Sequence, residues 1–279
     1  MHAINHILIS ATQQLHAISE TALLDAQVLL AHALHVNQAY LYTWPNKTVS
    51  EEQYQQFQSM LNRRLTSEPI AYIIGQKEFW SLPFIVNSST LIPRSETELI
   101  VEFCVNTFTS DQALKLLDLG TGCGAIAIAI ASMRPNWQIV ATDISNDALT
   151  TAQKNAENLQ INTVQFIQSH WFKQVPLAQF DIIISNPPYI AKDDSHLNSP
   201  ELAYEPMQAL VSDDQGMSDL SHIIRHAQRY LASNGYLILE HGYNQSDAVS
   251  QLMSANGYTH IINQADLSGI QRVTAGRNK

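Results

Sequence analysis

The sequence predicts an α/β protein in which a small helical domain precedes a doubly wound sheet of parallel strands. Two observations predict this fold. From Ala113 onward, short apolar runs alternate with helical stretches, and the first quarter of the chain has the periodicity of helices instead. A chain of 279 residues is long for one compact core and short for two full-sized domains. One larger domain with a small accessory domain is the simplest division.

The N-terminal region, residues 4–65, is expected to be a small helical bundle. Within Ala22–Leu34, apolar residues recur at intervals of three and four, and Ser19 or Thr21 can cap the start of that helix. The segment Ser50-Glu51-Glu52-Gln53 fits a helix N-terminus, because Ser is a good N-cap and acidic residues are favoured in the first turn.

Residues 72–91 change character. They contain Gly75, aromatic and β-branched residues, and a polar break at Asn87-Ser88-Ser89, which together predict a hairpin linker. We therefore place a helical domain at 1–74, a β-hairpin linker at 75–93 and an α/β domain at 94–279. Five strands are predicted in the last of these, at Leu114–Leu119, Gln138–Asp143, Val164–Ile167, Phe180–Ser185 and Tyr236–Glu240.

Composition and charge exclude several classes of protein. No run of about 18 apolar residues could span a bilayer, and Met1–Ser10 lacks the pattern of a signal peptide, so we expect a cytoplasmic protein. The net charge of −10 disfavours a partner such as duplex DNA, whose binding depends on clustered Lys and Arg. Cys104 and Cys123 are expected to be buried thiols.

No metal site is expected from the eleven histidines. His222 and His226 have helical i, i+4 spacing, but the intervening Ile223-Ile224-Arg225 supplies no Glu, unlike a zinc-binding His-Glu-x-x-His helix.

A glycine-rich turn follows the first predicted strand. Gly120-Thr121-Gly122-Cys123-Gly124 leads into an apolar helix, and its glycines allow close approach of the backbone to a ligand. The spacing Gly-x-Gly-x-Gly differs from the Gly-x-Gly-x-x-Gly that places a pyrophosphate on a helix N-terminus. Asp143, at the end of the next strand, can accept hydrogen bonds from both ribose hydroxyls of an adenosine. S-adenosylmethionine, which carries no phosphate, fits both features, although tight packing and helix capping would explain them without a ligand.

The segment Asn186-Pro187-Pro188-Tyr189 follows the fourth predicted strand. Two prolines stiffen the turn, and the Asn186 side-chain oxygen and the Pro187 carbonyl can accept both hydrogens of a planar NH2 group. Such acceptors favour the transition state of nitrogen methylation, because the nitrogen gains positive charge, so no strong general base is required. Tyr189 would offer its aromatic ring to the planar acceptor. The alternative is a plain proline turn.

The chain resembles the release factor glutamine methyltransferases, also called the HemK or PrmC family, over nearly its whole length. The residues that carry the resemblance are Glu68-Pro69-Ile70-Ala71-Tyr72, Leu91 to Glu98, Leu117 to Gly122, Asn186 to Tyr189, Tyr204-Glu205-Pro206 with Ala209-Leu210, and Arg272-Val273. Ser95-Glu96 departs from the Pro-Asp that is common in the family, and Cys123 stands where Thr is frequent.

The resemblance implies a class I methyltransferase (Rossmann-like) sheet of seven strands, joined by the hairpin to an N-terminal helical domain that recognises the substrate. It implies an enzyme that uses S-adenosyl-L-methionine, yields S-adenosyl-L-homocysteine, and methylates the glutamine of the Gly-Gly-Gln loop in class I peptide chain release factors. A monomer is expected because no long apolar face remains unassigned in the sequence. Carried over by position, the cofactor would contact Gly120, Thr121, Gly122, Cys123, Gly124, Asp143, Trp171 and Asn186. The glutamine would contact Asn186, Pro187, Pro188 and Tyr189, with Asn186 and Pro187 as the catalytic pair.

Three alternatives remain open from the sequence. Enzymes that methylate DNA adenine use the same Asn-Pro-Pro-Tyr turn, a sister family methylates a glutamine of a ribosomal protein, and a binding module could use the cofactor only for structure. Trp171 could equally be a core aromatic residue. Arg94, Glu96 and Glu98 fit a capped, solvated turn, and the alternative is a role in shaping the cofactor entrance.

Overall fold

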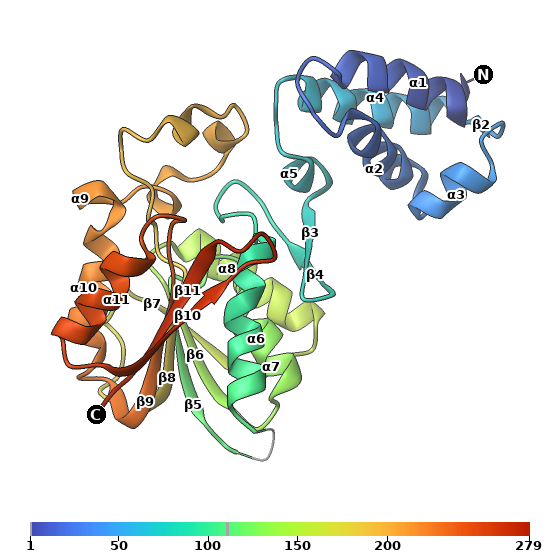
Figure 1. Ribbon diagram of the computed structural model, residues 1–279. Helices are drawn as coiled ribbons and strands as arrows, with labels where there is room; N and C mark the ends of the chain where they lie inside the picture. Colours follow the sequence, from blue (N-terminus) through green and yellow to red (C-terminus); the bar gives the residue numbers. More distant parts are fainter. Residues whose placement is uncertain (1, 110–111) are drawn as a thin grey trace. The chain divides into compact units, whose positions relative to one another are not determined.

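A computed structural model describes residues 2–109 and 112–279 (Figure 1). Met1, with which the predicted helical domain begins, and residues 110–111 of the predicted α/β domain lie outside the described residues. The chain divides into two compact units. The first contains residues up to Gln76 together with Ser199–Tyr204, and the second contains Lys77–Asn198 and Glu205–Lys279. No described helix is long and apolar enough to cross a membrane.

The first unit is a helical bundle, as the periodicity predicts. Its elements are β1 (His2–Ala3), α1 (Ile4–Leu15), α2 (Ala22–Leu34), α3 (Gln38–Thr43), β2 (Thr48–Val49), α4 (Glu51–Leu65) and α5 (Ile70–Ile74). The two short strands pair antiparallel. A buried apolar core joins the helices and includes Ile7, Leu15, Leu29, Leu30, Phe57 and Leu61.

The predicted helix starts have different outcomes. Ser50 forms a capping box with Gln53 at the start of α4, which confirms the prediction. Thr21 occupies the N-cap position of α2, but neither it nor Ser19 caps the helix through its side chain. The Thr21 hydroxyl instead donates to Asp25 Oδ1 at 3.1 Å, since a carboxylate in the first turn competes with the backbone for that hydroxyl.

A segment from the second half of the sequence completes the helical unit. Ser199–Tyr204 belongs to this unit, and Glu201 forms an ion pair with Arg64 of α4 at 2.6 Å. Arg64 is buried and also pairs with Asp25 of α2 at 2.8 Å. The Tyr204 hydroxyl donates to the Thr66 carbonyl at 2.9 Å. These polar contacts hold the segment on the end of α4.

The predicted hairpin is formed by β3 (Gln76–Phe79) and β4 (Leu82–Ile85). Its turn lies at Trp80-Ser81, where both residues have positive φ, of 52° and 58°. The hairpin predicted within residues 72–91 is therefore confirmed, and the polar break at Asn87-Ser88-Ser89 follows it. Trp80 can occupy this unfavourable region because its amide donates to Glu98 Oε1 at 2.7 Å. The polar break forms a separate turn, in which Asn87 Oδ1 accepts from the Ser89 amide at 2.9 Å.

The second unit is built on a seven-stranded sheet in the order β10-β11-β9-β8-β5-β6-β7. The five predicted strands are confirmed as β5 (Lys115–Leu119), β6 (Gln138–Asp143), β7 (Val164–Gln168), β8 (Phe180–Ser185) and β9 (Leu231–Glu240), and they run parallel. The last two strands, β10 (Thr259–Ala265) and β11 (Gln271–Arg277), pair antiparallel, and β11 also runs antiparallel to β9. The connection of five residues between them is too short for a parallel crossover.

Helices cover both faces of the sheet (Figure 1). One group consists of α6 (Glu98–Thr107), α7 (Ala125–Met133) and α8 (Asn146–Asn158), and the other contains α10 (Ser218–Ala227) and α11 (Ser246–Ala255). Short helical turns occupy Ser95–Thr97, Ser195–Asn198, Leu202–Tyr204 and Met207–Ala209, and α9 (Asp213–Gly216) precedes α10. In the sheet, β5 lies between β6, which follows it in the sequence, and β8, which the chain forms later, so the strand order reverses at β5. Ligands bind at such a switch point, beyond the carboxyl ends of the strands.

Candidate active site

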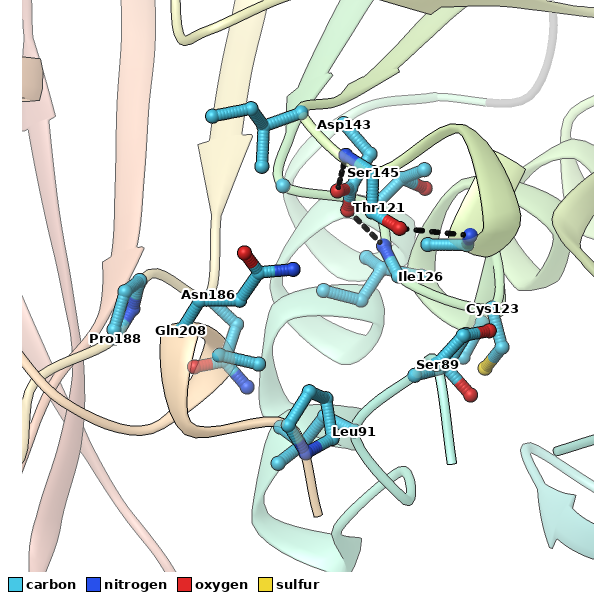
Figure 2. Close-up of a pocket in the computed structure, with 18 of the residues that line it drawn as sticks. Ser89, Leu91, Thr121, Cys123, Ile126, Asp143, Ser145, Asn186, Pro188 and Gln208 are labelled. Atoms are coloured by element: carbon cyan, nitrogen blue, oxygen red, sulfur yellow. Dashed lines mark hydrogen bonds between the residues drawn. The ribbon is translucent and has the colours of Figure 1, made fainter. Parts of the chain in front are cut away.

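A cavity of about 310 Å³ lies at the carboxyl ends of β5, β6, β7 and β8 (Figure 2). Residues after these four neighbouring strands line it, together with Ser89, Thr90, Leu91, Pro93 and the turn that begins at Pro206. Figure 2 shows Asn186, Pro188 and Gln208 on one side and Thr121, Asp143 and Ser145 on the other. None of the described residues that line it is Lys or Arg, although Asp143 and Asp219 contribute carboxylates. The cavity therefore suits a ligand without phosphate groups.

The glycine turn forms one wall of the cavity. Gly120, Thr121, Gly122 and Cys123 all line it. Gly120 has a φ of +74°, and the space beside its Cα is closed by the ring of Trp171, which a Cβ would meet at 3.6 Å. The backbone therefore approaches the cavity as the sequence predicts.

Gly124 has a different place from the other turn residues. It is not among the residues that line the cavity. A Cβ on Gly124 would lie 2.8 Å from Ile128 Cδ1 and 3.1 Å from Ala152 Cβ, and its φ is +85°. This glycine permits close packing of α7 on α8, so the predicted cofactor contact has no counterpart in the cavity.

A buried hydrogen bond between Thr121 and Asp118 supports the glycine turn. The Thr121 hydroxyl donates to Asp118 Oδ2 at 2.6 Å, and the amides of Gly120 and Thr121 both donate to the Thr142 carbonyl at 2.8 Å. Burial raises the pKa of Asp118 to about 7. These contacts fix the turn against both β5 and β6. Cys123 is also buried, which raises its pKa to about 12 and keeps its thiol neutral.

Asp143 ends β6 and holds two backbone amides. Its Oδ2 accepts from Gly122 and its Oδ1 accepts from Ser145, each at 2.9 Å. Burial raises the pKa of Asp143, while the backbone hydrogen bonds oppose that shift. Each carboxylate oxygen has further acceptor capacity toward the cavity, so the predicted ribose contact is available.

Trp171 lines the cavity in a constrained conformation. Its φ of 50° lies in the left-handed region, and its indole Nε1 donates to Asp219 Oδ1 at 3.2 Å. The Ser212 hydroxyl holds the other oxygen of Asp219 at 2.6 Å. A non-glycine residue at positive φ often marks a functional site. Trp171 is thus positioned as a fixed aromatic surface beside Gly120.

The Asn-Pro-Pro-Tyr turn divides between the cavity and the interior. Asn186 and Pro188 line the cavity, whereas Pro187 is buried and neither Pro187 nor Tyr189 is among the lining residues. The Tyr189 hydroxyl donates to Glu240 Oε1 at 3.2 Å, and the Tyr189 carbonyl accepts from Gln245 Nε2 at 3.1 Å. Tyr189 thus anchors the turn through these two hydrogen bonds. The described geometry does not support the predicted stacking of its ring on the glutamine side chain.

Two residues that the sequence analysis did not single out complete the Asn186 environment. Asn186 Nδ2 donates to Thr97 Oγ1 at 3.1 Å, and Glu240 accepts from the hydroxyl of Tyr189 in the same turn at 3.2 Å. Thr97 belongs to the segment Arg94-Ser95-Glu96-Thr97-Glu98, but only the contacts of the fold distinguish it from its neighbours.

The wall formed by residues 89–93 is held by Glu205. One oxygen of this buried carboxylate accepts from the Ile92 amide at 3.0 Å, and the other pairs with Arg94. Arg94 is therefore an anchoring residue through its ion pair with Glu205. Glu98 is one as well, because its carboxylate accepts from the Trp80 amide. The expectation that Arg94 and Glu98 decorate a solvated turn is wrong.

Comparisons with known proteins agree with this geometry. Family models described as the PrmC N-terminal domain and as a methyltransferase domain match residues 6–75 and 110–274. The chain is 47% identical to the release factor glutamine methyltransferase of Shewanella oneidensis over 264 residues, which cover 95% of this chain and 92% of the relative. It is 43% identical to that of Escherichia coli over 272 residues, which cover 98% of each.

A solved structure shows the same fold at low identity. The crystal structure of a methyltransferase from Pyrococcus furiosus superposes with a TM-score of 0.54 at 17% identity, and the match covers 80% of this chain and 98% of that one. The sheet of the second unit is thus a class I methyltransferase fold, and the identities above, over nearly the full length, show that the chain belongs to the release factor glutamine methyltransferase family.

Proposed function

We propose that this chain methylates the side-chain amide nitrogen of the glutamine in the Gly-Gly-Gln loop of class I release factors, with S-adenosylmethionine as donor. The observation that carries the proposal is the orientation of Asn186. Its Nδ2 is engaged by Thr97, which leaves Oδ1 as an acceptor on the wall of the cavity. A carboxamide NH2 group is the complementary donor.

The residues of the cavity fit S-adenosylmethionine. Asp143 is available to the ribose hydroxyls. Gly120 to Cys123 present their backbone to the cavity, and a Cβ at Gly120 would take up part of the space between this turn and Trp171. Trp171 offers a fixed aromatic surface for the adenine. The donor carries a sulfonium and an ammonium group, so carboxylates and the lack of Lys or Arg among the described lining residues suit it. When bound, it supplies an electrophilic methyl group.

The protein contributes position and hydrogen-bond acceptors to the transfer. Bound S-adenosylmethionine would supply the methyl group and keep the electron pair of its broken S–C bond, and the amide proton that the glutamine nitrogen loses would pass to solvent. Asn186 Oδ1 holds the NH2 group and stabilises the positive charge that develops on the nitrogen. The neutral thiol of Cys123 takes no part in proton removal.

The proposed substrate implies a reaction in the cytoplasm, where ribosomes and release factors meet. We further propose that the helical unit helps to bind the release factor. Large apolar side chains are exposed on it, among them Leu23 and Leu24, each about half exposed, and such groups are typical of interaction surfaces. A raised KM for the release factor in the Leu23→Ser, Leu24→Ser double variant is the corresponding readout.

The proposal is tested by incubating the purified chain with methyl-labelled S-adenosylmethionine and a class I release factor. The controls are the same factor with Ala in place of the loop glutamine, a ribosomal protein and unmethylated duplex DNA. Label on the unaltered factor alone is the expected result. Label on DNA or on the ribosomal protein would replace the substrate assignment.

A further inference from the structure

Residues 206–211 contribute to the wall of the cavity, and Gln208 is their one polar side chain. This segment is held near both ends. Glu205, directly before it, is buried and accepts from the Ile92 amide at 3.0 Å, and Leu210 is 5% exposed. Gln208, between these fixed points, is exposed and lines the cavity. The fold thus presents an amide side chain to the cavity without enclosing it.

The segment that carries Gln208 runs alongside the Asn-Pro-Pro-Tyr turn. Ile190, directly after the turn, forms a parallel bridge with Val211, and two backbone hydrogen bonds of 2.9 Å flank this bridge. In a parallel pair, the residues that precede the bridge on each segment lie on the same side of it. Asn186 precedes Ile190, and Gln208 precedes Val211. Figure 2 accordingly shows Gln208 on the side of the cavity that carries Asn186 and Pro188.

The Gln208 side chain has a free NH2 group. It forms no hydrogen bond with any residue that the structure describes. Several other lining side chains already donate their polar hydrogen to the protein, namely those of Ser89, Thr90, Thr121, Ser169 and Trp171. A ligand oxygen that enters this cavity therefore has few donors to meet, and Gln208 is able to supply one.

Three further lining side chains have a polar hydrogen but lie elsewhere. The Thr97 hydroxyl accepts from Asn186 Nδ2 at 3.1 Å, so it lies at the edge of that amide away from Oδ1. Ser145 and His170 follow β6 and β7, and β5 separates both of these strands from β8. Figure 2 shows Ser145 on the side opposite Asn186. Gln208 thus offers its donor on the wall where Asn186 Oδ1 is available.

A carboxamide needs a donor as well as an acceptor from its site. Its NH2 group donates, and in the proposed function Asn186 Oδ1 accepts from it. Its carbonyl oxygen loses water on entering the cavity, and an oxygen left without a donor costs about 1–3 kcal/mol. The described lining residues include no Lys or Arg, so a neutral side chain is needed to pair with this oxygen.

We propose that Gln208 binds the carbonyl oxygen of the acceptor glutamine through its Nε2, while Asn186 binds the NH2 group. This inference rests on the proposed function and adds a substrate-binding residue from outside the Asn-Pro-Pro-Tyr turn. Gln208 transfers no group and removes no proton. Its contribution is to pair the oxygen, so that the two atoms of the carboxamide are held by two different segments of the chain.

The pair of Asn186 and Gln208 selects an NH2 group that has an acceptor beside it. A lysine amine or an arginine guanidinium only donates, so it would leave Gln208 Nε2 without a partner. A carboxamide satisfies both residues. Adenine, whose N1 lies beside its amino group, has the same pattern, so Gln208 favours glutamine over basic side chains and not over this base.

The test uses two replacements of similar length. Gln208→Met removes the amide, whereas Gln208→Glu keeps its shape and turns an acceptor toward the carbonyl oxygen. We expect kcat/KM for the release factor to fall at least about tenfold in Gln208→Met, equivalent to about 1.4 kcal/mol, and at least about 100-fold in Gln208→Glu. The affinity for S-adenosylhomocysteine should change by less than about twofold, which also shows that both variants are folded.

Gln251→Met and Gln251→Glu are the matched controls, because Gln251 is exposed on α11. Both should keep kcat/KM within about twofold of wild type. A wild-type enzyme that methylates the release factor, with unchanged kcat/KM in Gln208→Met, would overturn the inference. So would a Gln208→Glu variant that is no worse than Gln208→Met, or a matching loss of S-adenosylhomocysteine affinity, which would assign Gln208 to the cofactor. A wild-type enzyme that labels no release factor would instead overturn the proposed function.

Discussion

Asp143 joins the ends of two structural elements, because its Oδ2 accepts from the Gly122 amide and its Oδ1 accepts from the Ser145 amide, each at 2.9 Å. The carboxylate therefore shapes the glycine turn and caps the approach to α8 while it faces the cavity. The same oxygens are available to a ribose, so one side chain couples the shape of the turn to ligand binding.

Replacing Asp143 with Asn should weaken cofactor binding. The amide keeps the volume of the carboxylate, but it cannot accept on both of its polar atoms, so Gly122 or Ser145 loses a partner. We expect the dissociation constant for S-adenosylhomocysteine to rise at least tenfold, or about 1.4 kcal/mol, in isothermal titration calorimetry. Asp247→Asn, at an exposed position of α11, is the control. Equal affinity in wild type and Asp143→Asn would rule out the ribose contact.

Gly124→Ala should destabilise the second unit through packing. The new methyl group would meet Ile128 and Ala152 at positive φ, so we expect a loss of about 2–3 kcal/mol in free energy of unfolding. Gly269→Ala is the matched control, because Gly269 also has positive φ but has no atom within 4 Å of a Cβ. Its loss should be about 1 kcal/mol. Chemical denaturation measures both values, and equal losses would show that backbone strain alone is involved.

The buried Arg64 should stabilise the helical unit mainly through Asp25. Arg64→Met leaves the Asp25 carboxylate buried without its cation, which costs about 3–5 kcal/mol. Glu201→Gln removes only a partner whose side chain is 48% exposed, so its cost should stay below about 1 kcal/mol. Denaturant unfolding of both variants checks this order. A larger cost for Glu201→Gln would show that the segment Ser199–Tyr204 is the main contributor.

The stability of the protein should depend on the protonation of Glu240. Because the pKa of Glu240 is raised to about 7 in the folded state, the protonated form favours folding. This contribution is complete below the ordinary value of 4.5 and is lost as the pH rises through 7. The loss is on the order of 3 kcal/mol. The free energy of unfolding, measured by denaturation between pH 4 and about pH 8, should therefore change with pH differently in wild type and in Glu240→Gln. Parallel curves would contradict the raised pKa.

Local patterns in the sequence predict the features of the fold that are local. Buried strands such as β5 and β8 are short apolar runs, and the glycine turn, Asp143 and Asn186 follow directly at the ends of strands. Strand β10 escapes prediction because it lies at the edge of the sheet and alternates with exposed polar residues, so it has no continuous apolar run.

Features that depend on distant contacts are not predictable in this way. Thr97 contacts Asn186 and Glu240 contacts Tyr189 only because the start of α6 and the end of β9 both approach the turn after β8. The segment Ser199–Tyr204 lies with the helical unit through Arg64 and Thr66, more than a hundred residues away in the sequence. The hairpin turn at Trp80-Ser81 lacks Gly and Asn, the residues that usually mark positive φ, because the contact of Trp80 with Glu98 stabilises it.

In the proposed reaction, Asn186 presents its side-chain oxygen to a glutamine nitrogen. The decisive measurement is tandem mass spectrometry of the release factor after reaction with wild type or with Asn186→Ala. We predict one added methyl group on the side-chain nitrogen of the Gly-Gly-Gln glutamine with wild type, and a rate lower by at least about 100-fold with Asn186→Ala, while S-adenosylhomocysteine still binds. A methyl group on another residue, or full methylation by Asn186→Ala, would contradict the account.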